Sequence, residues 1–390
     1  MTKASKMEYY EEIEKRYKKS DKEEKGIILD EFCKICKYNR KYAIRKLNNP
    51  PQPLEKPATE KPLGRPKKYY SKAIENYILK VWKTTNLICS KRLKVPLVEW
   101  IEFYDAEIGE DTTYKLTEED QKLIRQISPS TIDRLLASHR NRYQKRGLST
   151  TKPGSIIREM IPIKTNQWEE VKPGYFEADT VVHCGSSLSG TMAYTLNLVD
   201  IATGWTAQRA VLGKGETRVL EAISDIENDL PFKILGFDSD NGNEFMNWHL
   251  YRYLTKRKNP INYTRSRPYE KNDNSHIEQK NWTIVRQYLG YQRIDTLKAV
   301  KKMNQLYSNE FSMFLNYYIP SVKLIRKDRI GSKITKKHDM AKTPEQRVQE
   351  SKHVDEKTKM ILRRIKSRLN PFELERKIKL QIKEILDLSV

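Results

Sequence analysis

The chain has 390 residues, with 74 Lys and Arg against 51 Asp and Glu, which gives a net charge of +23. A hydrophobic content of 37% and 22 tyrosines supply enough apolar mass for real cores, so full disorder is excluded. No window approaches the roughly 18 apolar residues of a membrane span. The first residues lack the apolar run of a secretory signal, and four cysteines are too few for a disulfide scaffold. We therefore expect a multidomain protein of a reducing compartment, without a membrane partner.

The charge is unevenly distributed along the chain. The net charge is +9 over 1–72, +2 over 73–170, zero over 171–290 and +12 over 291–390. Basic ends around a neutral centre indicate a polyanionic partner such as nucleic acid, whose counterions are released on binding. A lysine-rich composition typical of an AT-rich genome is the alternative, but it does not explain the neutral centre.

Residues 1–48 predict three short helices. Asn39 is placed to cap the third, which is short and basic and carries Arg40 and Arg45. This pattern is typical of a helix-turn-helix DNA-binding module, whose last helix enters the major groove. A generic three-helix unit with a charged surface is the alternative. The helices are expected over 7–18, 22–36 and 39–48.

Residues 49–70 form a basic linker with six prolines. Its Gly-Arg-Pro-Lys-Lys end resembles half of an AT-hook, in which Arg65 would read a narrow minor groove. A plain basic linker is an equal alternative.

Residues 71–150 predict a second helical DNA-binding module. Ser128 and Pro129 are helix-start signals. The helix that they open carries Thr131 and Arg134, which we expect to be exposed and to contact DNA. Residues 151–170 are a connector. The four helices are expected over 71–83, 89–104, from 117 and from 128.

Residues 171–290 change to a pattern that predicts a mixed α/β sheet flanked by helices, in the order β-β-β-α-β-α-β-α. Strands are expected over 175–183, 191–201, 204–212, 232–237 and 261–264, and helices over 215–228, 243–257 and 274–288. The basic C-terminal region, 291–390, is expected to be mostly α-helical. Its helices are predicted over 296–318, 345–368 and 371–389, with two short β-like pieces between 319 and 343.

Three acidic residues stand out for where they lie in this pattern. Asp179 is in the first strand, Asp240 follows the buried fourth strand, and Glu278 opens the last long helix. First and fourth strands of such a sheet are commonly neighbours, so the three carboxylates would converge. Converging carboxylates repel one another unless a cation neutralises them, and an all-oxygen set favours Mg²⁺ or Mn²⁺.

These residues resemble the catalytic core of the retroviral-integrase superfamily, the Asp-Asp-Glu transposases with an RNase H-like fold. The matching pieces are Asp179, the segment Ser-Asp-Asn-Gly-x-x-Phe at 239–245, and Glu278 followed by Asn281. The two later acids are 38 positions apart, slightly more than is usual in the family. The resemblance covers about 120 residues, and the layout of the flanks is similar to that of bacterial insertion-sequence transposases.

The resemblance implies a DNA transposase that cleaves the 3′ ends of a mobile element and joins them to target DNA. It implies two metal ions per active site, with Asp179 bridging both, Asp240 on one and Glu278 on the other. The partners would be double-stranded DNA, as element ends and target, and further copies of the chain assembled on those ends. The expected location is the bacterial cytoplasm, in association with the nucleoid. The rivals are an RNase H-like nuclease without strand transfer and a domesticated, non-catalytic DNA-binding regulator.

Several neighbours of the three acids compete for roles. Asp238 is the alternative to Asp240, which fits the Asp-Asn-Gly pattern better, and Glu244 is interpreted as a helix-start residue.

The spacing of Cys33 and Cys36 is compatible with a zinc site, but no histidine pair lies near them, so packing on a helix is the better interpretation. Four basic residues around Glu278 are expected to contact DNA, with a solvated basic face as the alternative: Arg265, Arg267, Lys271 and Lys280.

Overall fold

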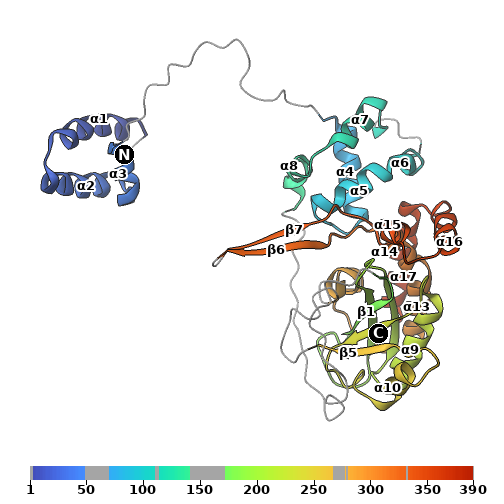
Figure 1. The fold of residues 1–390 in the computed structure, drawn as a ribbon. Helices are drawn as coiled ribbons and strands as arrows, with labels where there is room; N and C mark the ends of the chain where they lie inside the picture. The colour runs from blue at the N-terminus through green and yellow to red at the C-terminus, as the bar shows by residue number, and fades with distance from the viewer. Residues whose placement is uncertain are drawn as a thin grey trace. The chain divides into compact units, whose positions relative to one another are not determined.

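The computed structural model describes residues 3–48, 70–109, 114–140, 172–266, 277, 280–330 and 333–389, excluding the side chains of 3–7, 327, 329, 330, 333 and 334. The chain divides into two compact units, Met1–Lys68 and Tyr69–Val390 (Figure 1). Each unit is built around its own buried apolar residues.

The first unit contains the three predicted helices, α1 (Lys3–Lys19), α2 (Lys22–Cys36) and α3 (Arg40–Asn48). They pack around Phe32, which is completely buried, and Cys36 lies in the same core. The Asn39 side chain accepts a hydrogen bond from Lys41 N at 3.0 Å, which confirms the predicted start of α3. The three-helix prediction is therefore confirmed, whereas DNA binding by this unit stays a prediction.

The second unit begins with α4 (Lys72–Thr84), α5 (Ser90–Glu99), α6 (Ile101–Ile108), α7 (Glu118–Gln126) and α8 (Pro129–Arg140). The single helix predicted over 89–104 is wrong, because the chain leaves helical geometry at Trp100. The Trp100 ring is fully buried and lies 5.4–6.4 Å from the rings of Phe314, Tyr318 and Phe372. These partners come from the C-terminal part of the chain, so the helices α4–α8 share a core with that part.

A five-stranded mixed sheet forms the centre of this unit, as predicted. Its strands are β1 (Tyr175–Val182), β2 (Ala193–Asp200), β3 (Thr206–Leu212), β4 (Gly236–Ser239) and β5 (Asn262–Arg265). The strand order is β3-β2-β1-β4-β5; the first three strands are antiparallel, and β4 and β5 run parallel to β1. The expected contact between the first and fourth strands is confirmed.

The fourth strand begins later than predicted, at Gly236 instead of Phe232. The Phe232 ring packs against the rings of Phe176 and Trp205 at 6.0 and 6.4 Å, so it fills the core from outside the sheet. At Gly236 the backbone passes directly against the Tyr175 ring, where a Cβ atom would overlap ring carbons. Glycine therefore sets the point at which the strand joins the sheet.

Two helices cover one face of the sheet, α9 (Glu216–Asp229) and α10 (Trp248–Thr255). The first matches its prediction. The second is shorter than the predicted 243–257, because Asn247 caps it by accepting a hydrogen bond from Leu250 N at 2.9 Å. Their apolar residues, among them Val219 and Leu250, form a core with Phe237 of the sheet.

The opposite face is covered by the chain from Ile277 onward. Its helical pieces are η4 (Asn281–Arg286), α12 (Gln287–Leu289), α13 (Leu297–Leu306), η5 (Tyr307–Phe311) and α14 (Ser312–Tyr318), of which η4 and η5 are π-helical. Asn304 and Asn316 hydrogen-bond the backbone of β3 through their side chains. These bonds fasten the helices to the sheet.

The chain ends with a hairpin, β6 (Leu324–Ile330) and β7 (Lys333–His338), and the helices α15 (Pro344–Glu350), α16 (Glu356–Lys366) and α17 (Pro371–Asp387). The helix predicted over 345–368 is two helices, because Asp355 caps α16 by accepting a hydrogen bond from Thr358 N at 2.8 Å. No helix in the described ranges has both the length and the apolar character needed to cross a membrane.

Candidate active site

A row of polar side chains runs across three strands on one face of the sheet. Residues directly opposite each other in antiparallel strands project from the same face. Asp179 of β1 lies opposite Asn197 of β2, and Asn197 lies opposite Gln208 of β3. Asn197 and Gln208 are completely buried, whereas Asp179 is partly buried. The row therefore leads from two buried amides, on β3 and β2, to a partly exposed acid on the central strand β1.

Three side-chain amides form a chain of hydrogen bonds that ends at Asp179. Gln208 Nε2 donates to Asn197 Oδ1 and Asn197 Nδ2 donates to Asn281 Oδ1, each at 2.9 Å. Asn281 Nδ2 then donates to Asp179 Oδ2 at 2.6 Å. The other carboxylate oxygen, Oδ1, accepts a hydrogen bond from Thr180 N at 2.7 Å. Both oxygens of Asp179 are thus held in place, one by its own strand and one by η4.

Asp240 follows β4 and lies beside the β1 acid, because the register sets Ala178 opposite Ser239 just before them. Its Oδ1 accepts a hydrogen bond from Gly242 N at 2.9 Å. A Cβ atom at Gly242 would lie 2.8 Å from the carboxyl carbon of Glu244 and 2.9 Å from Asp240 Oδ1. A side chain at position 242 would therefore displace one of these two carboxylates, which gives the glycine of the Asp-Asn-Gly triplet a physical reason.

Glu244 is a third carboxylate at this place. It lies in the turns before α10, four residues ahead of Trp248, so the interpretation as a helix-start residue is wrong. The side chain is buried; it accepts a hydrogen bond from Thr180 Oγ1 at 2.9 Å, and Lys214 Nζ lies 3.4 Å away. Because Thr180 follows Asp179 directly, Glu244 is tied to the same stretch of β1.

The electrostatics of Asp179 follow from these neighbours. Burial and the negative charges of Asp240 and Glu244 raise the pKa of Asp179 to about 8, against the hydrogen bonds from Thr180 and Asn281. Carboxylates that disfavour one another's charge in this way suit a cation. Within the described ranges no three His, Cys, Asp or Glu side chains form a group able to hold a metal ion. The third predicted ligand, Glu278, lies outside the described residues.

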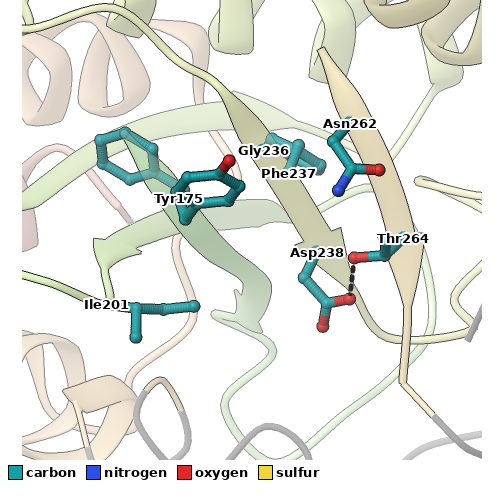
Figure 2. A pocket seen from close by; sticks show the side chains of 8 residues that line it. Tyr175, Ile201, Gly236, Phe237, Asp238, Asn262 and Thr264 are labelled. Atoms are coloured by element: carbon teal, nitrogen blue, oxygen red, sulfur yellow. Dashed lines mark hydrogen bonds between the residues drawn. The ribbon is translucent and has the colours of Figure 1, made fainter. Parts of the chain in front are cut away.

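The neighbouring acids on the same face point to structural roles. Figure 2 shows Asp238 beside Thr264 of β5, whose hydroxyl donates to its carboxylate. They line a cavity of about 10 Å³ near the start of the strands, which has room for a single water molecule at most. Glu177 accepts a hydrogen bond from Ile277 N at 3.0 Å. Both acids are buried, whereas Asp240 is partly exposed, which favours Asp240 over Asp238 as the reactive acid.

The predicted basic surface beside the site is described in part. Arg265 ends β5, and its Nη1 donates to Asn241 Oδ1 at 3.2 Å, next to the Asp-Asn-Gly turn. Lys280 directly precedes Asn281, and its burial, together with Arg92 and Arg347, lowers its pKa to about 7. Arg267 and Lys271 lie outside the described residues.

The predicted DNA contacts in the helical parts have mixed outcomes. Arg40 and Arg45 are exposed, and Arg40 forms an ion pair with Asp30. The expectation that Thr131 is exposed is wrong, because the residue is buried at the start of α8, where its hydroxyl lies 3.0 Å from that of Ser128. Arg134 donates to Thr131 Oγ1 at 3.2 Å. Arg65 lies outside the described residues.

Three polar residues of this site were missed by sequence reasoning: Glu244, Asn197 and Gln208. A usable signal exists for two of them. Asn197 interrupts the apolar run Leu-Asn-Leu-Val of β2, and Gln208 is an amide in β3, where the sequence reads Ala-Gln-Arg-Ala-Val-Leu. Since a buried amide needs a partner, an amide in each of two adjacent buried strands indicates a shared polar network. The sequence around Glu244 has no feature that indicates that its side chain reaches the site.

Comparisons with known proteins identify one similar curated protein. It is the uncharacterized protein y4rM of Sinorhizobium fredii, with 34% identity over 338 residues, which cover 86% of this chain and 92% of that protein. No family model matches the chain.

Solved structures similar to the chain include retroviral integrase cores. The HTLV-2 integrase catalytic core domain in complex with magnesium shares 15% identity over 39% of this chain and 92% of its own, with a TM-score of 0.29. The BIV integrase catalytic core domain shares 17% identity over 46% of this chain and 96% of its own, with a TM-score of 0.28.

Proposed function

The chain belongs to the same family as the y4rM protein of Sinorhizobium fredii, and we propose that it is a metal-dependent DNA transposase. The reaction would cleave the 3′ ends of a mobile element and join them to target DNA. One observation carries the proposal: Asp179 is fixed beside Asp240 at the sheet surface by a hydrogen bond from Asn281 of the covering helix.

The sheet supports an RNase H-like core of the Asp-Asp-Glu type. Three antiparallel strands are followed by two that run parallel to the first, and the acids lie on β1 and directly after β4. Asn281 stands three residues after Glu278, the acid proposed to complete the set. The nuclease and the non-catalytic regulator remain rivals, and the experiment below separates them.

The described acidic residues of the site have the oxygen ligands that divalent cations prefer. The carboxylates of Asp179 and Asp240 supply hard oxygen ligands, and their mutual repulsion is what bound cations would relieve. We propose two Mg²⁺ or Mn²⁺ ions, held by these two acids and Glu278. When bound, such ions activate an attacking water or 3′-hydroxyl and stabilise the departing 3′ oxygen.

The chain's own contribution is positioning. Thr180 N and Asn281 Nδ2 orient Asp179, and Gly242 N orients Asp240. Lys214 reduces the negative charge of Glu244, so the site carries fewer uncompensated carboxylates. A preformed arrangement of this kind avoids reorganisation during phosphoryl transfer.

DNA and further copies of the chain are the proposed partners. Specific reading of element ends is assigned to the first unit through Arg40 and Arg45, and to α8 through Arg134. Arg265, Lys280 and the undescribed Arg65, Arg267 and Lys271 are proposed phosphate contacts. Two ends must be joined to one target, so we propose a homo-oligomer that assembles on DNA.

The test uses DNA ends recovered by binding selection with the whole protein, followed by cleavage and strand-transfer assays in Mg²⁺. Asp179→Asn and Asp240→Asn should each lower both reactions about a thousandfold or more, since several kcal/mol of transition-state stabilisation are lost. End binding should be unchanged. Glu221→Gln, an exposed acid on α9, is the matched control and should behave as wild type.

The outcomes separate the rivals. Cleavage without joining identifies a nuclease, and binding without either reaction identifies a regulator. Normal activity of Asp240→Asn together with loss of activity in Asp238→Asn would show that the second acid is assigned to the wrong residue.

A further inference from the structure

The β6–β7 hairpin is strongly basic. Between Leu324 and His338 the sequence has six Lys and Arg and one acid, Asp328. That acid is already paired, because Arg326 Nε lies 2.7 Å from its carboxylate. Lys336 and Lys337 are exposed, and no carboxylate in the described ranges pairs with either. The hairpin therefore presents uncompensated positive charge to solvent.

The register of the two strands concentrates this charge. Positions 326 and 337, both basic, lie opposite each other, and so do the basic positions 327 and 336. Successive positions on a strand project from opposite faces, so each face of the ribbon has one like-charged pair. Like charges directly opposite each other destabilise a two-stranded ribbon. An anion bound along the ribbon would remove this cost.

The base of the hairpin is fixed firmly to the rest of the second unit. Ser321 and Lys342 exchange two backbone hydrogen bonds of 2.9 and 3.0 Å. Arg347 of α15 donates to Asp339 Oδ2 at 2.6 Å and to Ser321 O at 2.9 Å. Lys323 Nζ donates to Ala202 O in the turn between β2 and β3.

Among the described residues of the ribbon, 324–326, 328 and 335–338, none forms a hydrogen bond or ion pair with another element of the unit. Figure 1 shows β6 and β7 extending away from the sheet and helices of their unit, and Ile325 is 62% exposed. A rigid base under an exposed basic ribbon suits a binding arm. Charged residues alone also protect exposed strands from aggregation, which is the plainer interpretation of the lysines. It explains neither the partly buried, ion-paired base nor the like-charged pairs.

We propose that the β6–β7 hairpin is an arm that lies in a groove of double-stranded DNA and contacts its phosphates. Strands of this length span roughly 20 Å at about 3.3 Å per residue, and a two-stranded ribbon fits the major groove of B-form DNA, which is about 12 Å wide. Residues 324–338 include no Phe, Tyr or Trp, and the single imidazole, His338, lies at the base, so the ribbon lacks a platform for base stacking. The proposal rests on the proposed function, which supplies DNA as the partner.

The experiment measures binding of the whole protein to a labelled DNA duplex of unrelated sequence, with EDTA present and at several salt concentrations. The double substitution Lys336→Glu with Lys337→Glu should weaken binding about tenfold or more near 0.1 M salt. The slope of log affinity against log salt should decrease by about 1.8, or about 0.9 for each phosphate that the variant no longer neutralises. The matched control is Lys377→Glu with Lys383→Glu, which makes the same charge change on exposed positions of α17 and should retain most of the affinity.

A second variant removes the arm and keeps its base. Residues 324–338 are replaced by an Asn-Gly turn between Lys323 and Asp339, whose backbones are already joined by a hydrogen bond of 2.9 Å. It should bind DNA as weakly as the charge-reversal variant while melting at the wild-type temperature. An RNA duplex of the same sequence should show a smaller loss, because its major groove is too narrow for the ribbon.

Three results would overturn the proposal. The first is unchanged DNA affinity in both hairpin variants, and the second is an equal loss in the α17 control. The third is a change in oligomeric state without DNA, by light scattering, while DNA affinity stays constant, since the ribbon would then join copies of the chain. Because binding is measured without metal, absence of cleavage or joining by the wild type contradicts only the proposed function.

Discussion

The two faces of the central sheet differ in the kind of residue that they bury. The face under α9 and α10 is apolar, with Phe176, Leu196 and Phe237 in one core. The face under η4 and α14 instead buries Asn197 and Gln208, next to Asp179. Both faces belong to the same strands, so the difference arises only from alternate positions along them.

This difference shows which face of the sheet stabilises the fold and which face does so less. Burying an amide or carboxyl group costs free energy unless each polar atom finds a partner, whereas burying Phe237 is favourable by itself. In the part of the chain that the structure describes, the apolar face buries the cation Arg209, which is paired with Asp225 and Asp229 of α9. On the polar face the partners form a chain that ends at a reactive acid. We infer that the apolar face supplies stability and the polar face supplies the site.

The variant with the largest expected effect removes an aromatic ring from the apolar face. Phe237→Ala should lower the free energy of unfolding by about 3–5 kcal/mol, because it leaves a cavity between Phe245 and Tyr263. Urea unfolding measures the loss. Strand transfer per folded molecule should stay near wild type at low temperature. A severe loss of activity in fully folded protein would contradict the separation between the two faces.

The second test breaks the amide chain on the polar face. Asn197→Ala leaves Asn281 Oδ1 and Gln208 Nε2 without their partners, so Asp179 should be less well oriented. The turnover of strand transfer should decrease about 10–100-fold, as for other residues that orient metal ligands. DNA affinity should be unchanged.

A matched control exists for this variant. Asn316 is also completely buried, and its side chain bonds both the N–H and the carbonyl of Thr206 on β3. Asn316→Ala should lower stability to a similar degree, about 1–3 kcal/mol, without the decrease in turnover. Equal losses of turnover in the two variants would mean that the amide chain is merely structural.

The last test concerns His183, which continues the polar face beyond β1. The ring is completely buried, its Nε2 lies 2.8 Å from Thr195 Oγ1, and burial together with Arg286 lowers its pKa to about 3. The unfolded chain takes up a proton near pH 6.5, whereas the folded chain does not. The stability contributed by neutral His183 is therefore present above pH 6.5 and decreases by about 1.4 kcal/mol per pH unit below it, down to about pH 3.

Urea unfolding between pH 7 and pH 5 measures this dependence. His183→Gln should remove most of the slope that the wild type shows in this range. An identical slope in both proteins would show that other groups control the acid sensitivity.

Local features of the sequence determined much of this fold. The caps at Asn39 and Ser128, the alternating strands of the core and the apolar stripe of α9 lie within a few residues of the structure that they specify. The Asp-Asn-Gly turn belongs with them, because a Cβ atom at Gly242 would meet the carboxylates of Asp240 and Glu244, its near neighbours. Interactions of such short range leave a pattern that can be read along the chain.

Only the tertiary structure decided which distant residues meet. The rings that pack against Trp100 lie more than 200 positions away in the sequence, and the partners of Asn197 lie on another strand and on η4. Glu244 reaches the site because its turn folds back against Thr180, 64 positions earlier. Such contacts form only after the chain has paid the entropy of closing long loops, and no local spacing encodes them. For that reason the sequence pointed to Asp179 and Asp240, while the network that holds them came from the fold.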